Sequence, residues 1–238
     1  MALSTISGTN GMVTAPHFLA AQAGCDVLKD GGNAVEAAVA VAATLAVVYP
    51  HMTGIGGDSF WLVAEPDGAV HSVHGCGGAA ARADLGLYAG MDAVPTRGPL
   101  AANTVAGTVS GWAAILESGG GRLPLSRLLR DAIHHADTGV AVTSGGAAIA
   151  AAKGAELRIQ PGAYAAIFEP EGRPLREGDR LRQPALAATL RRIADDGPTD
   201  FYAGALADMV ALDLAELGSP VGRDDLAAEG GHPDITQR

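Results

Sequence analysis

The stretch Ala34–Val48 constrains the fold of this chain more than any other, because every residue in it except Glu36 and Thr44 is apolar. A surface helix would show a single apolar stripe, so a helix that is apolar all round must be buried. Asn33 stands where it can cap this helix, and Glu36 follows at the spacing of a capping box. A membrane span needs about 20 apolar residues, so the stretch predicts a central helix of a soluble core.

A β-hairpin is predicted directly after this helix. Pro50 ends the helix, the turn-rich MTGIGGD follows, and residues 59–65 have the composition of a strand. Glu65-Pro66-Asp67-Gly68 then provides a turn, and residues 69–74 form the expected return strand. The sequence therefore predicts a core helix that leads into a core hairpin.

The remainder of the chain is predicted to be mostly helical. Apolar residues recur at helical spacing in several segments, and a brief strand is expected at residues 12–15. The final GGHPDITQR has no pattern that predicts regular structure. The expected helices begin near Pro16 and lie around residues 16–30, 125–136, 143–155, 186–193 and 206–217. Residues 104–111 are expected to form a tight turn into a further helix that ends near Ser118.

The composition narrows the possible functions. A chain of 238 residues that is 48% hydrophobic can bury a substantial core, and we expect residues 1–238 to form a single domain. The net charge of −10 disfavours nucleic acid and anionic membranes as partners. Two cysteines give no disulfide framework, and the first residues lack the features of a signal peptide. We therefore expect a cytoplasmic protein.

Three motifs could suggest a specific site, but the sequence around each of them argues against it. Gly54-Ile55-Gly56-Gly57 lies between a helix and a strand, whereas a phosphate-binding loop lies between a strand and a helix, so we expect only a tight turn. No base is identifiable near Cys76 that would make it a nucleophile. His134 and His135 are adjacent and would point apart on a helix, so we expect no metal site, and no motif calls for a cofactor.

Four segments together resemble the γ-glutamyltransferase family. They are GMVTAPHFLAAQAG, LKDGGNAVEAAVAVAATLAVVYPHMTGIGGDSFWLV, VAGTVSGW and LRQPALAATLRRIADDGPTDFYAGALADMV, in that order. The resemblance covers nearly the whole chain. It implies an α/β fold, namely the helix-rich large-subunit portion of the four-layer αββα sandwich of N-terminal-nucleophile (Ntn) hydrolases. It also implies a precursor that cuts itself into a large and a small subunit.

In such a family the new N-terminal threonine of the small subunit is the nucleophile. The family's Thr-Thr-His junction does not occur in these 238 residues, and Thr236 lacks its context. We therefore expect no catalytic residue in this chain, which resembles the front of a large subunit and depends on a small subunit from the same precursor. The alternative is a truncated, non-catalytic paralogue that acts by association.

The resemblance also directs attention to three candidate substrate-binding residues. Glutathione-using members carry an arginine after the hairpin, and Cys76 stands in its place, where it would line the substrate pocket. Asp58 replaces a usual glycine and either faces the substrate or caps its own turn. Arg97 either supplies a carboxylate partner from another direction or is an ordinary solvated arginine. A cysteine cannot form a bidentate pair with a carboxylate.

These departures favour a small amide other than a γ-glutamyl compound as the substrate. Within the family, members similar to oxamate amidohydrolase or the cephalosporin acylases become the better guides, and a true glutathione hydrolase remains the alternative.

Overall fold

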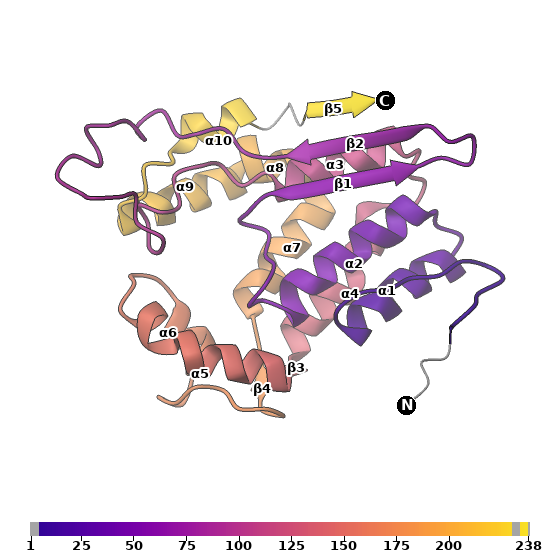
Figure 1. The fold of residues 1–238 in the computed structure, drawn as a ribbon, viewed down its shortest axis with the longest axis horizontal. Helices are drawn as coiled ribbons and strands as arrows, with labels where there is room; N and C mark the ends of the chain where they lie inside the picture. Colours follow the sequence, from indigo (N-terminus) through magenta and orange to yellow (C-terminus); the bar gives the residue numbers. More distant parts are fainter. Residues whose placement is uncertain (1–4, 230–233, 238) are drawn as a thin grey trace.

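The computed structural model describes residues 5–229 and the backbone of residues 234–237, and these residues form a helix-rich α/β fold (Figure 1). In chain order the elements are α1 (Phe18–Lys29), α2 (Ala34–Val48), β1 (Ser59–Ala64), β2 (Val70–Gly75), α3 (Thr108–Ser118), α4 (Leu125–Thr138), β3 (Val140–Ala141), α5 (Ser144–Arg158), α6 (Tyr164–Phe168), β4 (Arg180–Leu181), α7 (Pro184–Asp196), α8 (Pro198–Ala203), α9 (Ala205–Leu217), α10 (Arg223–Glu229) and β5 (Asp234–Gln237).

Helix α2 is the centre of the core, as its sequence predicts. It packs between α1 and α4, and only Ala34 and Ala38 of its residues are exposed (Figure 1). The predicted capping box is present: the Asn33 side chain accepts a hydrogen bond from the Glu36 N–H at 2.9 Å. The Glu36 carboxylate in turn accepts from the Asn33 N–H at 2.7 Å. Two N–H groups that lack helical partners are thereby satisfied.

The close approach of α1 and α2 depends on Gly24. A Cβ atom at this position would lie 2.7 Å from the Val41 side chain and 2.9 Å from that of Val13. Real side chains do not tolerate such contacts without displacement, so a residue without a side chain is required where these helices cross. The alanines of α2 serve the same purpose along the rest of its length.

The main sheet has three antiparallel strands in the order β1-β2-β5. The predicted hairpin is present, with Ser59 paired to Gly75 at one end and Ala64 paired to Val70 at the turn. The prediction for the end of the chain is wrong, because residues 234–237 add a third strand along β2. The strand expected at residues 12–15 is also wrong, since this segment has no regular structure.

The two faces of the hairpin differ strongly. On β1, alternate residues are half-buried and exposed, and the side chains of Trp61 and Val63 pack against the core. Helix α3 lies on this inner face. On the other face, Phe60 is 69% exposed and Leu62 is 77% exposed. The sheet is therefore covered by helices on one side and presents large apolar side chains on the other.

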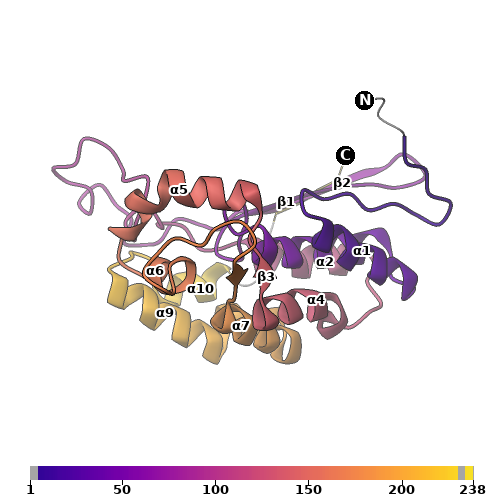
Figure 2. The same cartoon turned by 90° about the horizontal axis from the view of Figure 1, so that it is seen from below.

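A smaller unit made of α5, α6 and the β3–β4 pair lies away from α1 (Figures 1 and 2). Helix α5 has one buried residue, Gly154, which accounts for its weak apolar pattern in the sequence. The carboxylate of Glu169 accepts two hydrogen bonds from Arg158, at 2.8 and 2.6 Å, and ties the end of α6 to α5. Among the described residues, no helix combines the length and the apolarity that a bilayer crossing requires.

Candidate functional site

Two of the three predicted substrate-binding residues lie together at one end of the hairpin. Ser59 and Gly75 form the last pair of the β1–β2 ladder, and Asp58 and Cys76 are the residues directly outside that pair. Both are exposed. Asp58 and Cys76 therefore lie at the same end of the hairpin, and both residues are exposed.

Glycines bring this end of the hairpin into backbone contact with the start of α3. The Cα of Gly75 and the Cα of Gly107 each face the other residue's carbonyl oxygen so closely that neither position could hold a Cβ atom. A Cβ on Gly111 would collide with the Ser59 hydroxyl and lie 3.2 Å from the Trp61 indole nitrogen. The glycines of VAGTVSGW are therefore needed for packing, and they fix α3 beneath the hairpin.

Thr108 fastens the glycine loop that carries Asp58. Its hydroxyl donates a hydrogen bond to the Gly57 carbonyl oxygen at 2.7 Å, and its backbone N–H donates to the same oxygen at 2.9 Å. The turn of residues 54–57 is thereby tied to the first residue of α3. This geometry agrees with the prediction of a turn that joins a helix and a strand closely.

The first turn of α3 is also held from the other side by Tyr202 of α8. This tyrosine is 1% exposed, and its hydroxyl donates to the Ala106 carbonyl oxygen at 2.7 Å and accepts from the Ser110 N–H at 2.9 Å. Burial raises the pKa of Tyr202, so the hydroxyl stays protonated and able to donate. With the Thr108 and Ser110 N–H groups both bonded to protein atoms, two donors of this helix start are unavailable to an anion.

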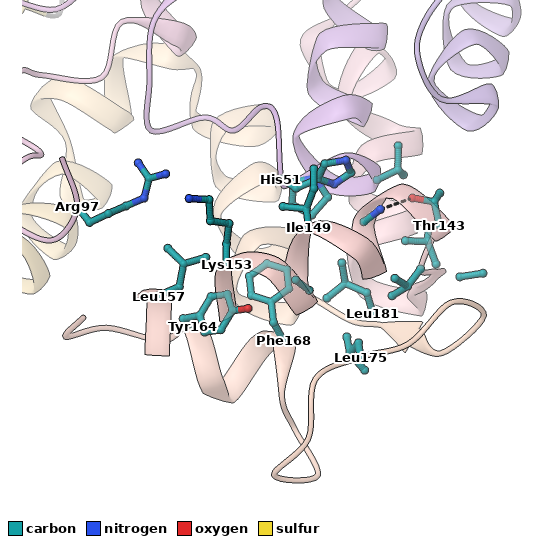
Figure 3. Close-up of a pocket in the computed structure, with 17 residues that line it drawn as sticks. His51, Arg97, Thr143, Ile149, Lys153, Leu157, Tyr164, Phe168, Leu175 and Leu181 are labelled. Atoms are coloured by element: carbon teal, nitrogen blue, oxygen red, sulfur yellow. Dashed lines mark hydrogen bonds between the residues drawn. The ribbon is translucent and has the colours of Figure 1, made fainter. Parts of the chain in front are cut away.

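The third predicted residue, Arg97, lies elsewhere. It lines a cavity of about 380 Å³ between the end of α2 and the unit formed by α5 and α6, and neither Asp58 nor Cys76 lines that cavity (Figure 3). The other residues around the cavity are Val48, Pro50, His51, Val140, Ala141, Val142, Thr143, Gly146, Ile149, Ala150, Lys153, Leu157, Tyr164, Phe168, Leu175 and Leu181.

Arg97 is held at the edge of this cavity by a shared ion pair. Its Nε atom lies 3.1 Å from one carboxylate oxygen of Glu156, and the Nζ atom of Lys153 lies 3.1 Å from the other. The pKa of Glu156 is lowered, first by its hydrogen bond with Lys153 and then by the charges of Lys153 and Arg97. Two cations therefore share one carboxylate at the cavity rim.

Sequence reasoning did not find Lys153, Tyr164 or the cavity itself. The residues of α5 that line it are spaced as one helical face, but Gly146 and Ala150 are too small to mark that face as apolar. The opposite wall comes from α6, β3 and β4, which are too short to give a periodic signal. Within the described part of the chain, no group of three His, Cys, Asp or Glu side chains could hold a metal ion.

Comparisons with known proteins place this arrangement in a class. The fold superimposes on the γ-glutamyltranspeptidase of Helicobacter pylori with a TM-score of 0.89 and 29% sequence identity, over 99% of this chain and 67% of that one. A cephalosporin acylase from Bacillus halodurans matches with a TM-score of 0.82 and 34% identity, over 92% of this chain and 41% of that one. The structure thus has the fold of the γ-glutamyltranspeptidases.

The chain belongs to the γ-glutamyltranspeptidase family, whose sequence model matches residues 20–229. It is 49% identical over 224 residues to the oxamate amidohydrolase proenzyme of Klebsiella pneumoniae, covering 92% of this chain and 42% of that protein. It is 34% identical to the glutathione hydrolase proenzyme of Escherichia coli, over 94% of this chain and 39% of that one. The chain therefore spans about two fifths of the length of these relatives.

Proposed function

We propose that this chain is the large-subunit portion of an Ntn amidohydrolase of the γ-glutamyltranspeptidase family that cleaves a small amide. The observation that carries the proposal is the 49% identity to the oxamate amidohydrolase proenzyme over nearly the whole chain. This exceeds the 42% identity to a glutathione hydrolase-like proenzyme of Bacillus subtilis and the 34% identity to the glutathione hydrolase proenzyme of Escherichia coli. The relatives named here are amidohydrolases and glutathione hydrolases made as proenzymes, which supports both the chemistry and a processed precursor.

The reaction would use a nucleophile outside these residues. A threonine hydroxyl is a weak nucleophile at neutral pH, and a free N-terminal α-amine next to it can accept its proton. Attack on the amide carbon produces an oxyanion that fixed donors must stabilise, and loss of the amine leaves an acyl-enzyme for water to hydrolyse. This chain would supply the scaffold beneath that centre and one part of the substrate site.

The hairpin end is our candidate for that part of the site. A neutral cysteine at position 76 cannot grip the α-carboxylate of a γ-glutamyl group as an arginine fork would. Arg97 lies away from the hairpin end and is paired with Glu156, so we do not place it in this part of the site. The missing arginine fork at position 76 supports a small amide over a γ-glutamyl compound.

The exposed face of the hairpin is our candidate surface for the small subunit. Phe60 and Leu62 project from β1 on the side that no helix of the described residues covers. Large exposed apolar side chains on a sheet favour burial against a partner. A second sheet from the downstream part of the same precursor would bury them, because two sheets pack face to face about 10 Å apart.

The test is substrate preference of the purified full-length gene product. We expect a higher kcat/KM for oxamate than for a γ-glutamyl anilide, and we expect Cys76→Arg to shift the ratio toward the γ-glutamyl compound. Cys76→Ser is the control, because it changes the same position but keeps a small neutral side chain. Preferred γ-glutamyl turnover by the unmodified protein would contradict the assigned substrate class.

Absence of all amide hydrolysis, with no downstream threonine encoded in frame, would favour a non-catalytic paralogue that acts only by association.

A further inference from the structure

We propose that the cavity beside α5 binds a small monocarboxylate with an apolar tail. The cavity volume of about 380 Å³ equals the space of about a dozen water molecules at roughly 30 Å³ each. That is room for a ligand the size of octanoate, which has about ten non-hydrogen atoms. The proposal concerns binding and does not rest on the amidohydrolase activity proposed above.

Most of the side chains that line the cavity are apolar. Figure 3 shows the side chains of Leu175 and Leu181 on the side away from Arg97 and Lys153, with the ring of Phe168 between them and Lys153. Leu175 and Leu181 are buried, and the β3–β4 pair adds Val140 to the same wall. A surface of this kind gains free energy when an alkyl or aryl group displaces water from it, at about 25 cal/mol per Å² of apolar area.

The two charged side chains that line the cavity, Arg97 and Lys153, lie at its edge, and both are cations. Arg97, Lys153 and His51 lie along the upper edge of the cavity in Figure 3. No Asp or Glu is among the residues that line it, although the whole chain carries a net charge of −10. Both charged side chains among the described lining residues are therefore positive, which favours an anionic group over a cationic one.

The charge balance at the rim favours a single negative charge. Arg97 and Lys153 both pair with Glu156, so two positive charges face one carboxylate. One further carboxylate would complete a network of two cations and two anions, whereas a neutral ligand would leave the excess charge unmatched. Burial lowers the pKa of His51, so at neutral pH its imidazole is uncharged and adds no second excess charge.

The walls are fixed before any ligand enters. The bidentate pair between Arg158 and Glu169 joins α6 to α5, and Glu169 is 7% exposed. The ring of Tyr164 packs against Phe168 with centroids 5.2 Å apart. Because these contacts already hold the cavity open, a ligand would not have to supply the free energy of ordering its own site.

Helix α5 offers a matched pair of substitutions. Ala150 faces the cavity, whereas Ala152 is exposed on another face of the same helix and does not line it. Ala150→Phe would fill the cavity with a ring, and Ala152→Phe would place the same ring in solvent. Lys153→Met removes one rim charge, and because the Lys153 side chain is 52% exposed, we expect this variant to fold.

The experiment is isothermal titration of the full-length gene product with octanoate, with octanamide as the neutral probe. We expect saturable octanoate binding, at least tenfold weaker octanamide binding, loss of binding in Ala150→Phe and no change in Ala152→Phe. Lys153→Met should weaken octanoate binding by about tenfold, the effect of one lost charge-assisted hydrogen bond, and higher salt should also weaken it.

Two results would overturn the proposal. One is octanoate binding that survives Ala150→Phe, because the ligand would then lie elsewhere. The other is absence of octanoate binding to the folded wild-type protein, as expected if a downstream segment of the chain fills the cavity. Circular dichroism spectra of each variant must match the wild type for the comparison to count. None of these measurements requires amide hydrolysis, so their outcome is independent of the proposed activity.

Discussion

Replacement of Glu36 by glutamine is the sharpest test of how this core is held together. Glu36 is 1% exposed, and its carboxylate accepts three backbone hydrogen bonds. One comes from Asn33 at 2.7 Å, and two come from Arg122 and Leu123 at 2.5 Å each. The side chain thus joins the start of α2 to the turn between α3 and α4.

The magnitude follows from the number of acceptor atoms. Glutamine has one carbonyl oxygen, so its NH₂ group must face either the Asn33 N–H or the pair from Arg122 and Leu123. At least one partly buried N–H then loses its acceptor, which costs about 1–3 kcal/mol. The remaining bonds lose their charge assistance, and charge-assisted bonds are about twice as strong as neutral ones. We expect Glu36→Gln to lower the free energy of unfolding by about 2–4 kcal/mol.

The assay is urea unfolding of the full-length gene product at pH 7.5, with Glu117→Gln as the control. Glu117 is exposed on α3, so its replacement should change the free energy of unfolding by less than about 0.5 kcal/mol. A loss below about 1 kcal/mol for Glu36→Gln, the size of one ordinary hydrogen bond, would refute the reasoning.

The pH dependence gives a second, independent check. Burial alone would raise the pKa of Glu36, but the backbone N–H groups of Leu123, Asn33 and Arg122 bring it below the ordinary value of 4.5. A carboxylate whose pKa is lower in the folded state stabilises the fold above its unfolded pKa and loses that effect as the pH falls through its folded pKa. The stability difference between wild type and Glu36→Gln should therefore narrow below pH 4.5. A difference that stays constant would contradict this account.

Three further substitutions test other contacts. Tyr202→Phe removes the hydroxyl that holds the first turn of α3, and urea unfolding should show a loss of about 1–3 kcal/mol; an unchanged midpoint would rule out this role. Gly111→Ala places a methyl group against the Ser59 hydroxyl, so it should lower the melting temperature, whereas Gly145→Ala, with open space around it, should leave the melting temperature unchanged or raise it. His17 caps α1, because a nitrogen of its ring accepts a hydrogen bond from the Leu19 N–H. Burial, and then the charge of His51, lower the pKa of His17 from its ordinary value of 6.5. Protonation therefore favours the unfolded chain, and wild-type stability should fall as the pH drops below 6.5. His17→Asn should retain the cap and flatten the melting temperature between pH 7.5 and 5.5, and an equally steep profile in this variant would count against the assignment.

Local signals in the sequence predicted the part of the fold that local physics determines. The cap at Asn33, the run of apolar residues in α2 and the turn at Glu65–Gly68 all depend on neighbours a few positions away. They were confirmed as the N-terminal capping box, the buried helix and the hairpin. The family assignment was confirmed for the same reason, since its motifs are long and continuous in the sequence.

The remaining features depend on distant parts of the chain. Strand β5 forms because residues 234–237 meet an open edge of β2, and nothing in its own composition indicates that partner. The cavity exists because Arg97, Lys153 and the β3–β4 pair converge from separate segments. Of the predicted site residues, Asp58 and Cys76 lie at one end of the hairpin because the β1–β2 pairing ends beside them. Arg97 lies in a loop far from that end and pairs with Glu156 of α5, a contact that no local pattern indicates.

The central claim is that these residues scaffold an amide-cleaving centre whose nucleophile lies on a different segment. The most direct measurement is ammonia release from oxamate, by the 238-residue chain alone and by the full-length gene product. The account predicts turnover by the full-length product after self-cleavage before a threonine, and none by the 238 residues alone. Robust turnover by the isolated chain would contradict it.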